Sequence, residues 1–428
     1  MNVRKIEENL PKNLSRLDAL FLNAVDYTKL AITVGGEPGC LLSLEGQVNK
    51  QYVSLGVINP LLHSLIPQKD GVEIMAYVTE NVLAAVDQVQ VHHVEEIAEK
   101  LMLGFAVLLI DGCSYAVGFG VQGFQMRSVQ EPSNESMLRG SKEGFVESLA
   151  VNLSLVRRRM RTTDLKFERI FLGSQSNTPV LICYLQNRVS QEILNKIKLQ
   201  LKEVDLQTVM ASGYLTGYLK RGGIFGSVGI TERPDTVCGK IEEGRVAVMV
   251  DGTPTVLLVP YLFAENFQTL DDYANRPFYA TFARCIKYIA FFLAGILPGI
   301  YVAVITHRPE LIQDNLLVKI ATEESKTPLS ILWELLLVNL LYEIMREASL
   351  RAPKVFSQSV SIVGALVIGD TAVSSGLIGA PSLVVIALAA ISDFTIPRLH
   401  EQLSVLRFVF ILIGGFLGPW GIIFSCMF

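Results

Sequence analysis

The residues with the greatest potential for chemistry in this chain form a charged segment from Glu131 to Arg161. Charges of opposite sign alternate over its first half, at Glu131, Glu135, Arg139, Lys142, Glu143 and Glu147. Pro132, Gly140 and Gly144 exclude one continuous helix there, so we expect these side chains to lie on a loop. Such a loop either packs as a network of ion pairs or binds a charged partner, and the sequence leaves both interpretations open.

The second half of the segment is predicted to be a helix that ends in a basic run. Its apolar residues recur at helical spacing and form one stripe, made of Phe145, Leu149, Leu153, Val156 and Met160. The basic run fills the last turn, where cations complement the helix dipole; it consists of Arg157, Arg158, Arg159 and Arg161. We interpret this run as a solvated helix end, with contact to anionic lipid or to an acidic partner as the alternative.

Other motifs that could carry chemistry lack the context they need. Gly118 to Gly123 matches G-x-G-x-x-G, but a predicted hairpin precedes it, so we interpret it as a glycine-bearing strand. His92 and His93 are adjacent and point apart, and the six cysteines show no C-x-x-C spacing. We therefore expect no metal, no cofactor and no enzymatic activity, because no set of acid, base and nucleophile can be assembled. The net charge of −4 argues against binding of nucleic acid.

The elements that position the charged segment are predicted to belong to two copies of one α/β unit. The strands are expected at 29–34, 40–44, 105–110 and 114–118, and again at 167–172, 179–185, 245–250 and 255–259. Helices are expected at 49–65, 94–103 and 190–204. The turn Asp251-Gly252 follows Asp111-Gly112 by 140 residues, and the similar segments that begin at Leu44 and Leu185 are 141 apart. An offset this constant predicts an internal duplication.

The remaining third of the chain is predicted to lie in a membrane. Hydrophobic residues make up 50% of the chain and charged residues only 18%, against about a quarter charged in soluble domains. Uncharged runs occupy 288–306, 371–392 and 408–428, close to the roughly 20 residues that cross a bilayer. A shorter run at 355–369 is expected to form a broken or re-entrant segment. The polar N-terminus contains no signal peptide, which favours a cytoplasmic N-terminal half.

Two acids interrupt the apolar part of the sequence. Asp370 lies between two uncharged runs, and Glu334 lies inside a further apolar stretch. An acid within a membrane is costly unless it faces water or a partner, so both residues are candidates for a pore or ion path. A loop at the membrane surface is the alternative for Asp370, and Glu334 carries the same ambiguity. Arg276, Arg284 and Lys287 precede the first run and favour a cytoplasmic position for what comes before them.

The charged segment resembles the motif of the A-subunit family of spore germination receptors, the GerA family, which includes SpoVAF. That motif resembles E-P-x-x-E-x-x-x-R-G-x-x-E-G-F-x-E-x-x-x-x-N followed by a basic cluster. The residues that match it are Glu131, Pro132, Glu135, Arg139, Gly140, Glu143, Gly144, Phe145, Glu147, Asn152, Arg157, Arg158 and Arg159. Further matches are T-E-R-P-D from Thr231, V-D-G-T-P from Val250, FAENFQTLDDY from Phe263 and SIVGALVIGDTAV from Ser361.

The resemblance and the patterns together imply a fold. We expect an α/β soluble N-terminal region of two related subdomains, with mixed sheets and helices, followed by an α-helical transmembrane bundle. The expected parts are an N-terminal lead at 1–25, which we predict to be loosely ordered, a first subdomain at 26–130, a linker loop and basic helix at 131–161, a second subdomain at 162–280 and a transmembrane region at 281–428. Family members usually continue into a polar tail, so we expect the chain to be truncated at Phe428.

The resemblance also implies a function. Such proteins are expected in the spore inner membrane as multi-pass proteins with a cytoplasmic N-terminal region. The implied partners are a transporter-like B subunit, a lipoprotein C subunit and further copies of the chain. The expected function is that of an A-type germinant-receptor subunit, an oligomeric ion-channel component gated by its cytoplasmic domains. The alternative is a SpoVAF-like accessory protein that amplifies or scaffolds the release of ions.

Overall fold

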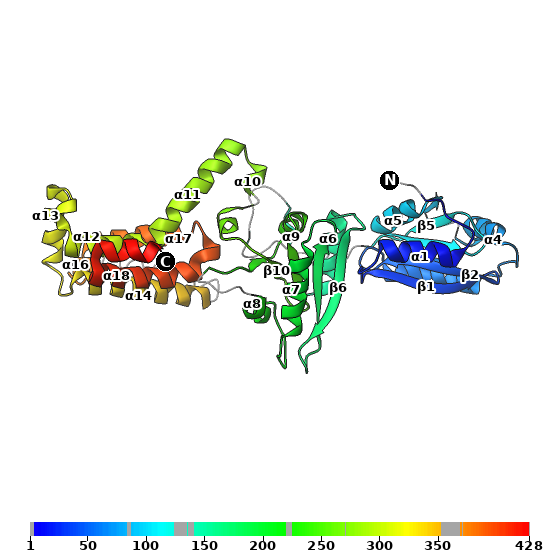
Figure 1. The fold of residues 1–428 in the computed structure, drawn as a ribbon, viewed down its shortest axis with the longest axis horizontal. Coiled ribbons are helices and arrows are strands. Elements are labelled where there is room, and N and C mark those ends of the chain that lie inside the picture. Colours follow the sequence, from blue (N-terminus) through cyan, green and yellow to red (C-terminus); the bar gives the residue numbers. More distant parts are fainter. Residues whose placement is uncertain are drawn as a thin grey trace. The chain divides into compact units, whose positions relative to one another are not determined.

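The computed structural model describes residues 4–83, 87–123, 135, 141–219, 225–269, 271–351, 369 and 371–427. The chain divides into two compact units, Met1–Leu262 and Phe263–Phe428, which Figure 1 colours along the sequence. All the strands that the structure describes belong to the first unit, and the described elements of the second unit are helices.

The first unit contains two five-stranded sheets with the same topology. The order in the first sheet is β1 (Tyr27–Val34), β2 (Glu37–Leu44), β4 (Phe105–Ile110), β5 (Ala116–Gly120) and β3 (Gln88–Val91). The order in the second is β6 (Leu165–Leu172), β7 (Thr178–Leu185), β9 (Val246–Val250), β10 (Val256–Val259) and β8 (Gly229–Thr231). The repeated order confirms the predicted duplication, and the eight expected strands are confirmed within a few residues.

All pairings between these named strands are antiparallel, so the expectation of mixed sheets is wrong. Part of the reason lies in the connections, because short turns reverse the chain from β1 to β2, β4 to β5, β6 to β7 and β9 to β10. Gly112 and Gly252 take the positive φ that these turns need, at +75° and +81°. Gly118 and Gly120 lie in the antiparallel strand β5, which confirms a glycine-bearing strand rather than a dinucleotide motif.

Helices cover both faces of each sheet. On the first sheet, α1 (Leu10–Leu20) and α5 (Val94–Met102) pack on one face. The other face is covered by the segments α2 (Lys50–Tyr52), η1 (Val53–Ile58), α3 (Asn59–His63), α4 (Gly71–Tyr77) and η2 (Val78–Val82). Residues of β4 alternate between the two cores, which explains why its sequence is apolar throughout.

The second sheet is covered in the same way. One of its faces packs against α6 (Leu149–Arg159) and α9 (Pro234–Glu242), and the other packs against α7 (Gln191–Lys202) and α8 (Gly213–Leu219). Figure 1 shows these helices beside the green strands of the second sheet. We call the two sheets with their helices the first repeat and the second repeat.

The first helix of each repeat is part of the core. Leu10 and Leu17 of α1 are buried against the first sheet, so the expectation of a loosely ordered lead is wrong for residues 10–20. Helix α6 holds the corresponding place in the second repeat, inside the segment that was expected to be a linker. The predicted apolar stripe packs in one core, but polar residues on other sides of the helix are buried as well, namely Asn152, Ser154 and Arg157. The cause is that α6 packs against its own sheet and also against the first repeat.

The same contacts hold both helices. The carboxylate of Asp111 accepts a hydrogen bond from Leu10 N at 2.8 Å, and that of Asp251 accepts one from Leu149 N at 3.0 Å. An asparagine side chain inside each helix then accepts from the main chain before the helix. Asn13 Oδ1 binds Glu7 N at 3.0 Å and Asn152 Oδ1 binds Val146 N at 2.8 Å. The Asp-Gly turn of each repeat therefore also anchors its first helix.

The second unit is built from helices that pack around one another. They are α10 (Asp271–Ala274), α11 (Pro277–Gly295), α12 (Leu297–His307), α13 (Asp314–Glu324), α14 (Ile331–Arg351), α16 (Ala372–Ser374), α17 (Ala380–Asp393) and α18 (His400–Met427). Figure 1 shows α12, α14, α17 and α18 side by side, and apolar residues of all four helices form a common core.

The helices do not follow the predicted uncharged runs. The run at 288–306 is divided between α11 and α12 at Ile296, because Pro298 begins a new helix instead of bending one. Among the described residues, two helices are long and apolar enough to cross a membrane, Pro277–Gly295 and Pro397–Met427. The shorter apolar helices are Leu297–His307 and Ala380–Asp393. The run expected at 355–369 lies, apart from Gly369, outside the described residues.

Helix α18 is broken near its end. Gly418 has a φ of +66°, and Pro419 follows it inside the helix. Proline has no N–H, so the carbonyl of Gly415 four residues earlier lacks its helical donor. The ring of His307, at the end of α12, lies with Nε2 at 2.9 Å from Gly415 O and replaces the missing partner.

Candidate functional site

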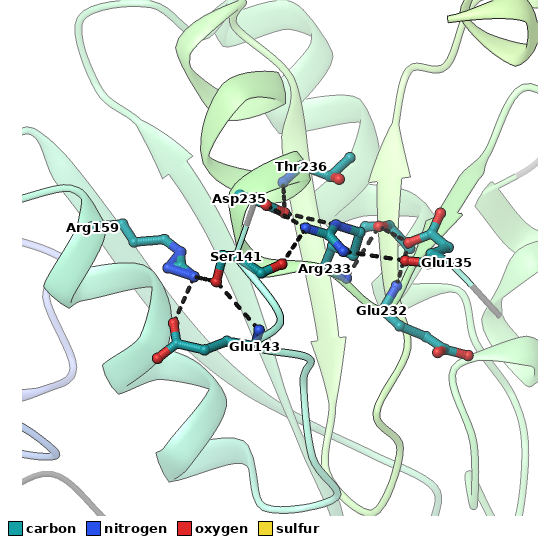
Figure 2. Close-up of polar contacts among 9 residues, drawn as sticks. Glu135, Ser141, Glu143, Arg159, Glu232, Arg233, Asp235 and Thr236 are labelled. Carbon is teal, nitrogen blue, oxygen red and sulfur yellow. Dashed lines mark hydrogen bonds and ion pairs between the residues drawn. The ribbon is translucent and has the colours of Figure 1, made fainter. Parts of the chain in front are cut away.

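The charged family motif folds around Arg233, which lies at the start of α9 and is 3% exposed (Figure 2). Its guanidinium donates to both carboxylate oxygens of Asp235, at 3.1 and 2.7 Å. It also donates to two main-chain carbonyls of the motif, those of Glu135 at 3.1 Å and Ser141 at 2.7 Å. One arginine thus joins the T-E-R-P-D segment to the loop before α6.

Two glutamates of this loop, Glu135 and Glu143, are paired with other residues of the chain. Glu135 Oε2 accepts from Thr231 Oγ1 at 2.6 Å and from Glu232 N at 3.0 Å. Glu143 pairs with Arg158 and with Arg159, the latter at 2.6 Å, and Figure 2 shows the Arg159 contact. Glu135 and Glu143 therefore belong to an internal network, in agreement with the first of the two interpretations for these two residues.

The remaining motif residues are placed as follows. Gly144 and Phe145 are buried, and Phe145 N donates to Glu232 O at 2.8 Å. Glu147 is exposed, and its main-chain carbonyl accepts from Gly252 N at 2.9 Å. Asn152 is buried in the helix contact described above. The positions Glu131, Pro132, Arg139 and Gly140 lie outside the described residues.

The basic run at the end of α6 is not solvated throughout. Arg157 pairs with Asp26 of the first repeat through two contacts of 2.9 Å, and both side chains are 0% exposed. The guanidinium lies 4.8 Å from the centre of the Phe167 ring and also donates to Thr162 O and Leu165 O. The interpretation of this run as a solvated end is wrong for Arg157, because its partner is 131 residues away in the sequence.

Further contacts join the two repeats beside this ion pair. Residues Asn23 to Val25 run parallel to β6, with Val25 N bound to Phe167 O at 3.1 Å and Phe167 N bound to Asn23 O at 3.0 Å. Gln47 Nε2 donates to Ser154 O at 3.3 Å. We call this contact the inter-repeat joint. The first repeat contributes residues 20–26 and Gln47, and the second contributes Ser154, Arg157, Lys166 and Phe167.

Lys166 lies at the edge of the inter-repeat joint. Its Nζ donates to Leu20 O at 2.9 Å. Burial lowers the pKa of this lysine, and the neighbouring Arg157 lowers it further. A cavity of about 420 Å³ opens beside the joint and has room for a small polar molecule; its lining includes Asn49 and Lys50 of the first repeat and Ser148 and Ser154 of the second.

A second polar centre lies inside the helical unit. Arg407 of α18 is fully buried and donates to Ala294 O at 2.9 Å, to Asn339 Oδ1 at 3.2 Å and to Asp393 Oδ2 at 3.3 Å. Asp393 also binds Nδ1 of His400. These contacts join the end of α11 to α14, α17 and α18. Sequence reasoning missed this cluster, although Asp393 and Arg407 are the charges that delimit two uncharged runs.

Of the two proposed acids of the ion path, the structure describes one. Glu334 of α14 is 1% exposed, and its Oε1 accepts from Gly379 N, immediately before α17, at 2.7 Å. A carboxylate in this place stabilises the N-terminus of α17 by its charge and its hydrogen bond. Asp370 lies outside the described residues.

The FAENFQTLDDY segment packs on the start of α11. Asp272 pairs with Arg284 at 2.8 Å and with Lys287 at 3.4 Å, and it accepts from Thr269 Oγ1 at 3.0 Å. Burial raises the pKa of Asp272, but the hydrogen bond from Arg284 and the charge of Lys287 outweigh this effect, so the pKa lies below its ordinary value. Two of the three basic residues that we used to predict orientation therefore share one acid as their partner, and the cluster keeps a net positive charge.

The charged motif that folds around Arg233 is the segment that resembles the spore germination proteins. The chain belongs to the GerA family, described as "Bacillus/Clostridium GerA spore germination protein", whose pattern matches residues 15–428. This result confirms the family resemblance that we drew from the motif.

Several known sequences are similar to this chain. Uncharacterized membrane protein YfkQ of Bacillus subtilis (strain 168) is 35% identical over 424 residues, which are 98% of this chain and 82% of that protein. Spore germination protein KA of the same strain is 37% identical over 333 residues, 77% of this chain and 61% of that protein. The crystal structure of the N-terminal domain of the A subunit of the Bacillus megaterium spore germinant receptor GerK3 aligns at 24% identity. Its TM-score is 0.49, and the alignment covers 61% of this chain and 99% of that domain.

We expect Arg233→Lys to loosen the loop before α6. Lysine keeps the charge but cannot reach Asp235 and both carbonyls together, because it lacks the planar fork of arginine. The expected loss is about 1.5–3 kcal/mol, seen as faster hydrogen exchange in peptides that cover 141–148. Arg161→Lys is the matched control, since Arg161 is exposed. Equal exchange in both variants would contradict the assigned role of Arg233.

Proposed function

We propose that this chain is an A-type subunit of a nutrient germinant receptor in the spore inner membrane. It acts as an oligomeric ion-channel component that is gated by its first unit, and it has no enzymatic activity. The observation that carries this proposal is the family match over residues 15–428. The motif of the family forms the charged centre around Arg233 in the first unit. We expect this connected network of hydrogen bonds to relay a signal through the first unit.

The proposed arrangement in the membrane uses the helical unit. The helices Pro277–Gly295 and Pro397–Met427 cross the bilayer, and the shorter apolar helices complete a multi-pass bundle. The first unit lies on the cytoplasmic side, in keeping with the basic residues near the start of α11. The partners are the B and C subunits of the receptor and further copies of this chain. Asp370 and Glu334 are retained as the proposed acids of the ion path.

Spores that lack this chain are expected to stop releasing cations in response to one nutrient or a small group of nutrients. The measurement is potassium release from purified spores, followed with an ion-selective electrode over a panel of nutrients. Complementation with the unchanged chain should restore release, and Asp370→Ala should alter its rate at an equal amount of protein. Slower release with every nutrient would favour the accessory role, and unchanged release with all of them would contradict both functions.

A further inference from the structure

The two repeats carry equivalent positions on equivalent faces. In the second repeat, Arg157 and Phe167 contact each other and face the first repeat. The helix register relates Arg157 to Asp18, 139 residues earlier, and the strand register relates Phe167 to Lys29, 138 residues earlier. Asp18 and Lys29 also contact each other, with Nζ at 2.8 Å from Oδ2. The first repeat therefore has its own version of the face that the second repeat uses in the inter-repeat joint.

This face of the first repeat is open within the described part of the chain. Strand β1 is at the edge of its sheet and has a paired strand, β2, on one side only. The side chains of Lys29 and Asp18 are 43% and 44% exposed. By contrast, the equivalent edge strand β6 is extended by residues Asn23 to Val25.

The opposite face is duplicated as well. In the inter-repeat joint, the first repeat contributes Asp26, Gln47 and the main chain of Asn23 to Val25. Asp164 stands in the position of Asp26, because the carbonyls of both accept from the equivalent residues Glu45 and Gln186, at 2.8 and 2.9 Å.

Arg188 stands in the position of Gln47 in the same way. A Cβ built on Gly104 would lie 2.8 Å from Gln47 O, and one built on the equivalent Gly244 would lie 2.8 Å from Arg188 O. Arg188 is exposed and Asp164 is half-buried. The second repeat therefore carries its own version of the face that the first repeat contributes to the inter-repeat joint.

We propose that these two open faces bind each other between copies of the chain. The face of one copy with Asp18 and Lys29 docks on the face of the next copy with Asp164 and Arg188, and this contact repeats the geometry of the inter-repeat joint. The charges are complementary in sum, since each face has one acid and one base. Lys29 then lies between Asp18 of its own copy and Asp164 of the next copy, and the main chain of residues 161–163 of the next copy pairs with β1.

The contact is head-to-tail, so it generates a closed ring or an open filament rather than a two-fold dimer. This inference rests on the self-association that we propose as part of the function. It assigns that self-association to a particular surface of the chain. Exposed edge strands are also commonly protected by a lysine against any pairing, which is the competing explanation of Lys29.

The test uses the full-length chain in detergent, with Cys285→Ser and Cys426→Ser to remove the two exposed thiols. One tagged chain carries Lys29→Cys, and a differently tagged chain carries Thr162→Cys. Position 162 is equivalent to Ala24, which pairs with Phe167 in the inter-repeat joint, and Phe167 is equivalent to Lys29. After mild oxidation, the mixture should form disulfide-linked heterodimers, and each variant alone should stay unlinked. A chain with both substitutions should form a ladder of multimers.

Charge reversal provides the second arm. Lys29→Glu should abolish most of the linkage between Leu30→Cys on one chain and Thr163→Cys on the other, the next opposed positions along the two segments, and adding Asp164→Lys should restore it. The control Lys12→Glu changes an exposed lysine elsewhere on α1 and should leave the yield unchanged. Oligomers of normal size without the mixed linkage would overturn the proposed contact and leave self-association intact. A chain that stays monomeric would overturn both, and homodimers of Lys29→Cys would show edge-to-edge pairing instead.

Discussion

Replacing Arg407 with methionine is expected to destabilise the helical unit by about 3–5 kcal/mol. The guanidinium is fully buried beside Asp393, which is 1% exposed, so the substitution leaves a buried carboxylate without its cation. It also removes the hydrogen bonds that join α18 to α11 and α14. The measurement is the thermal unfolding midpoint of the full-length chain in detergent, combined with hydrogen exchange in α14 and α17.

The control for this prediction is Arg308→Met. Arg308 pairs with Glu310 at 3.1 Å, but the two side chains are 56% and 59% exposed. An exposed pair contributes little, so we expect a change within about 0.5 kcal/mol. If Arg407→Met proved as stable as Arg308→Met, the cluster around Arg407 would not hold the helices together.

Replacing Arg157 with methionine is expected to separate the two repeats. The loss of the guanidinium leaves Asp26 buried without a partner, at a cost of about 3–5 kcal/mol, and removes the contact with Phe167. Hydrogen exchange of the full-length chain should show faster exchange in β6 and at residues 23–25, because these segments meet at the inter-repeat joint. Exchange in the interior strands β4 and β9 should change less.

A double substitution distinguishes a lost ion pair from a lost side chain. Asp26→Leu with Arg157→Met removes both charges together, and we expect it to recover most of the stability that Arg157→Met loses. Arg161→Met serves as the surface control, since Arg161 is exposed. A double variant no more stable than Arg157→Met would contradict the assignment of that loss to the unpaired carboxylate of Asp26.

The sheets of the first unit were predictable because local patterns determine them. The Asp111-Gly112 and Asp251-Gly252 turns need the left-handed conformation of glycine, and the apolar runs beside them form paired strands. The duplication was also readable, since the offset of these turns is preserved along the repeats. The parallel pairing implied by mixed sheets was the part of this prediction that failed.

The charged sites were harder to predict because their partners are distant in the sequence. Arg157 is one of four arginines within five residues, and nothing in its spacing separates it from Arg158, although the contact with Asp26 is made by Arg157. Arg407 and Asp393 lie on different helices, and each marks only the end of an apolar run until the helices pack. The role of residues 10–20 was missed for the same reason, since α1 is amphipathic and its position depends on the sheet it covers.

The break in α18 has a consequence for where a hydrogen atom must reside. A carbonyl only accepts hydrogen bonds, so the imidazole of His307 keeps a hydrogen on Nε2 to satisfy Gly415 O. The hydrogen bond between the ends of α12 and α18 therefore selects the Nε2–H tautomer of the neutral imidazole.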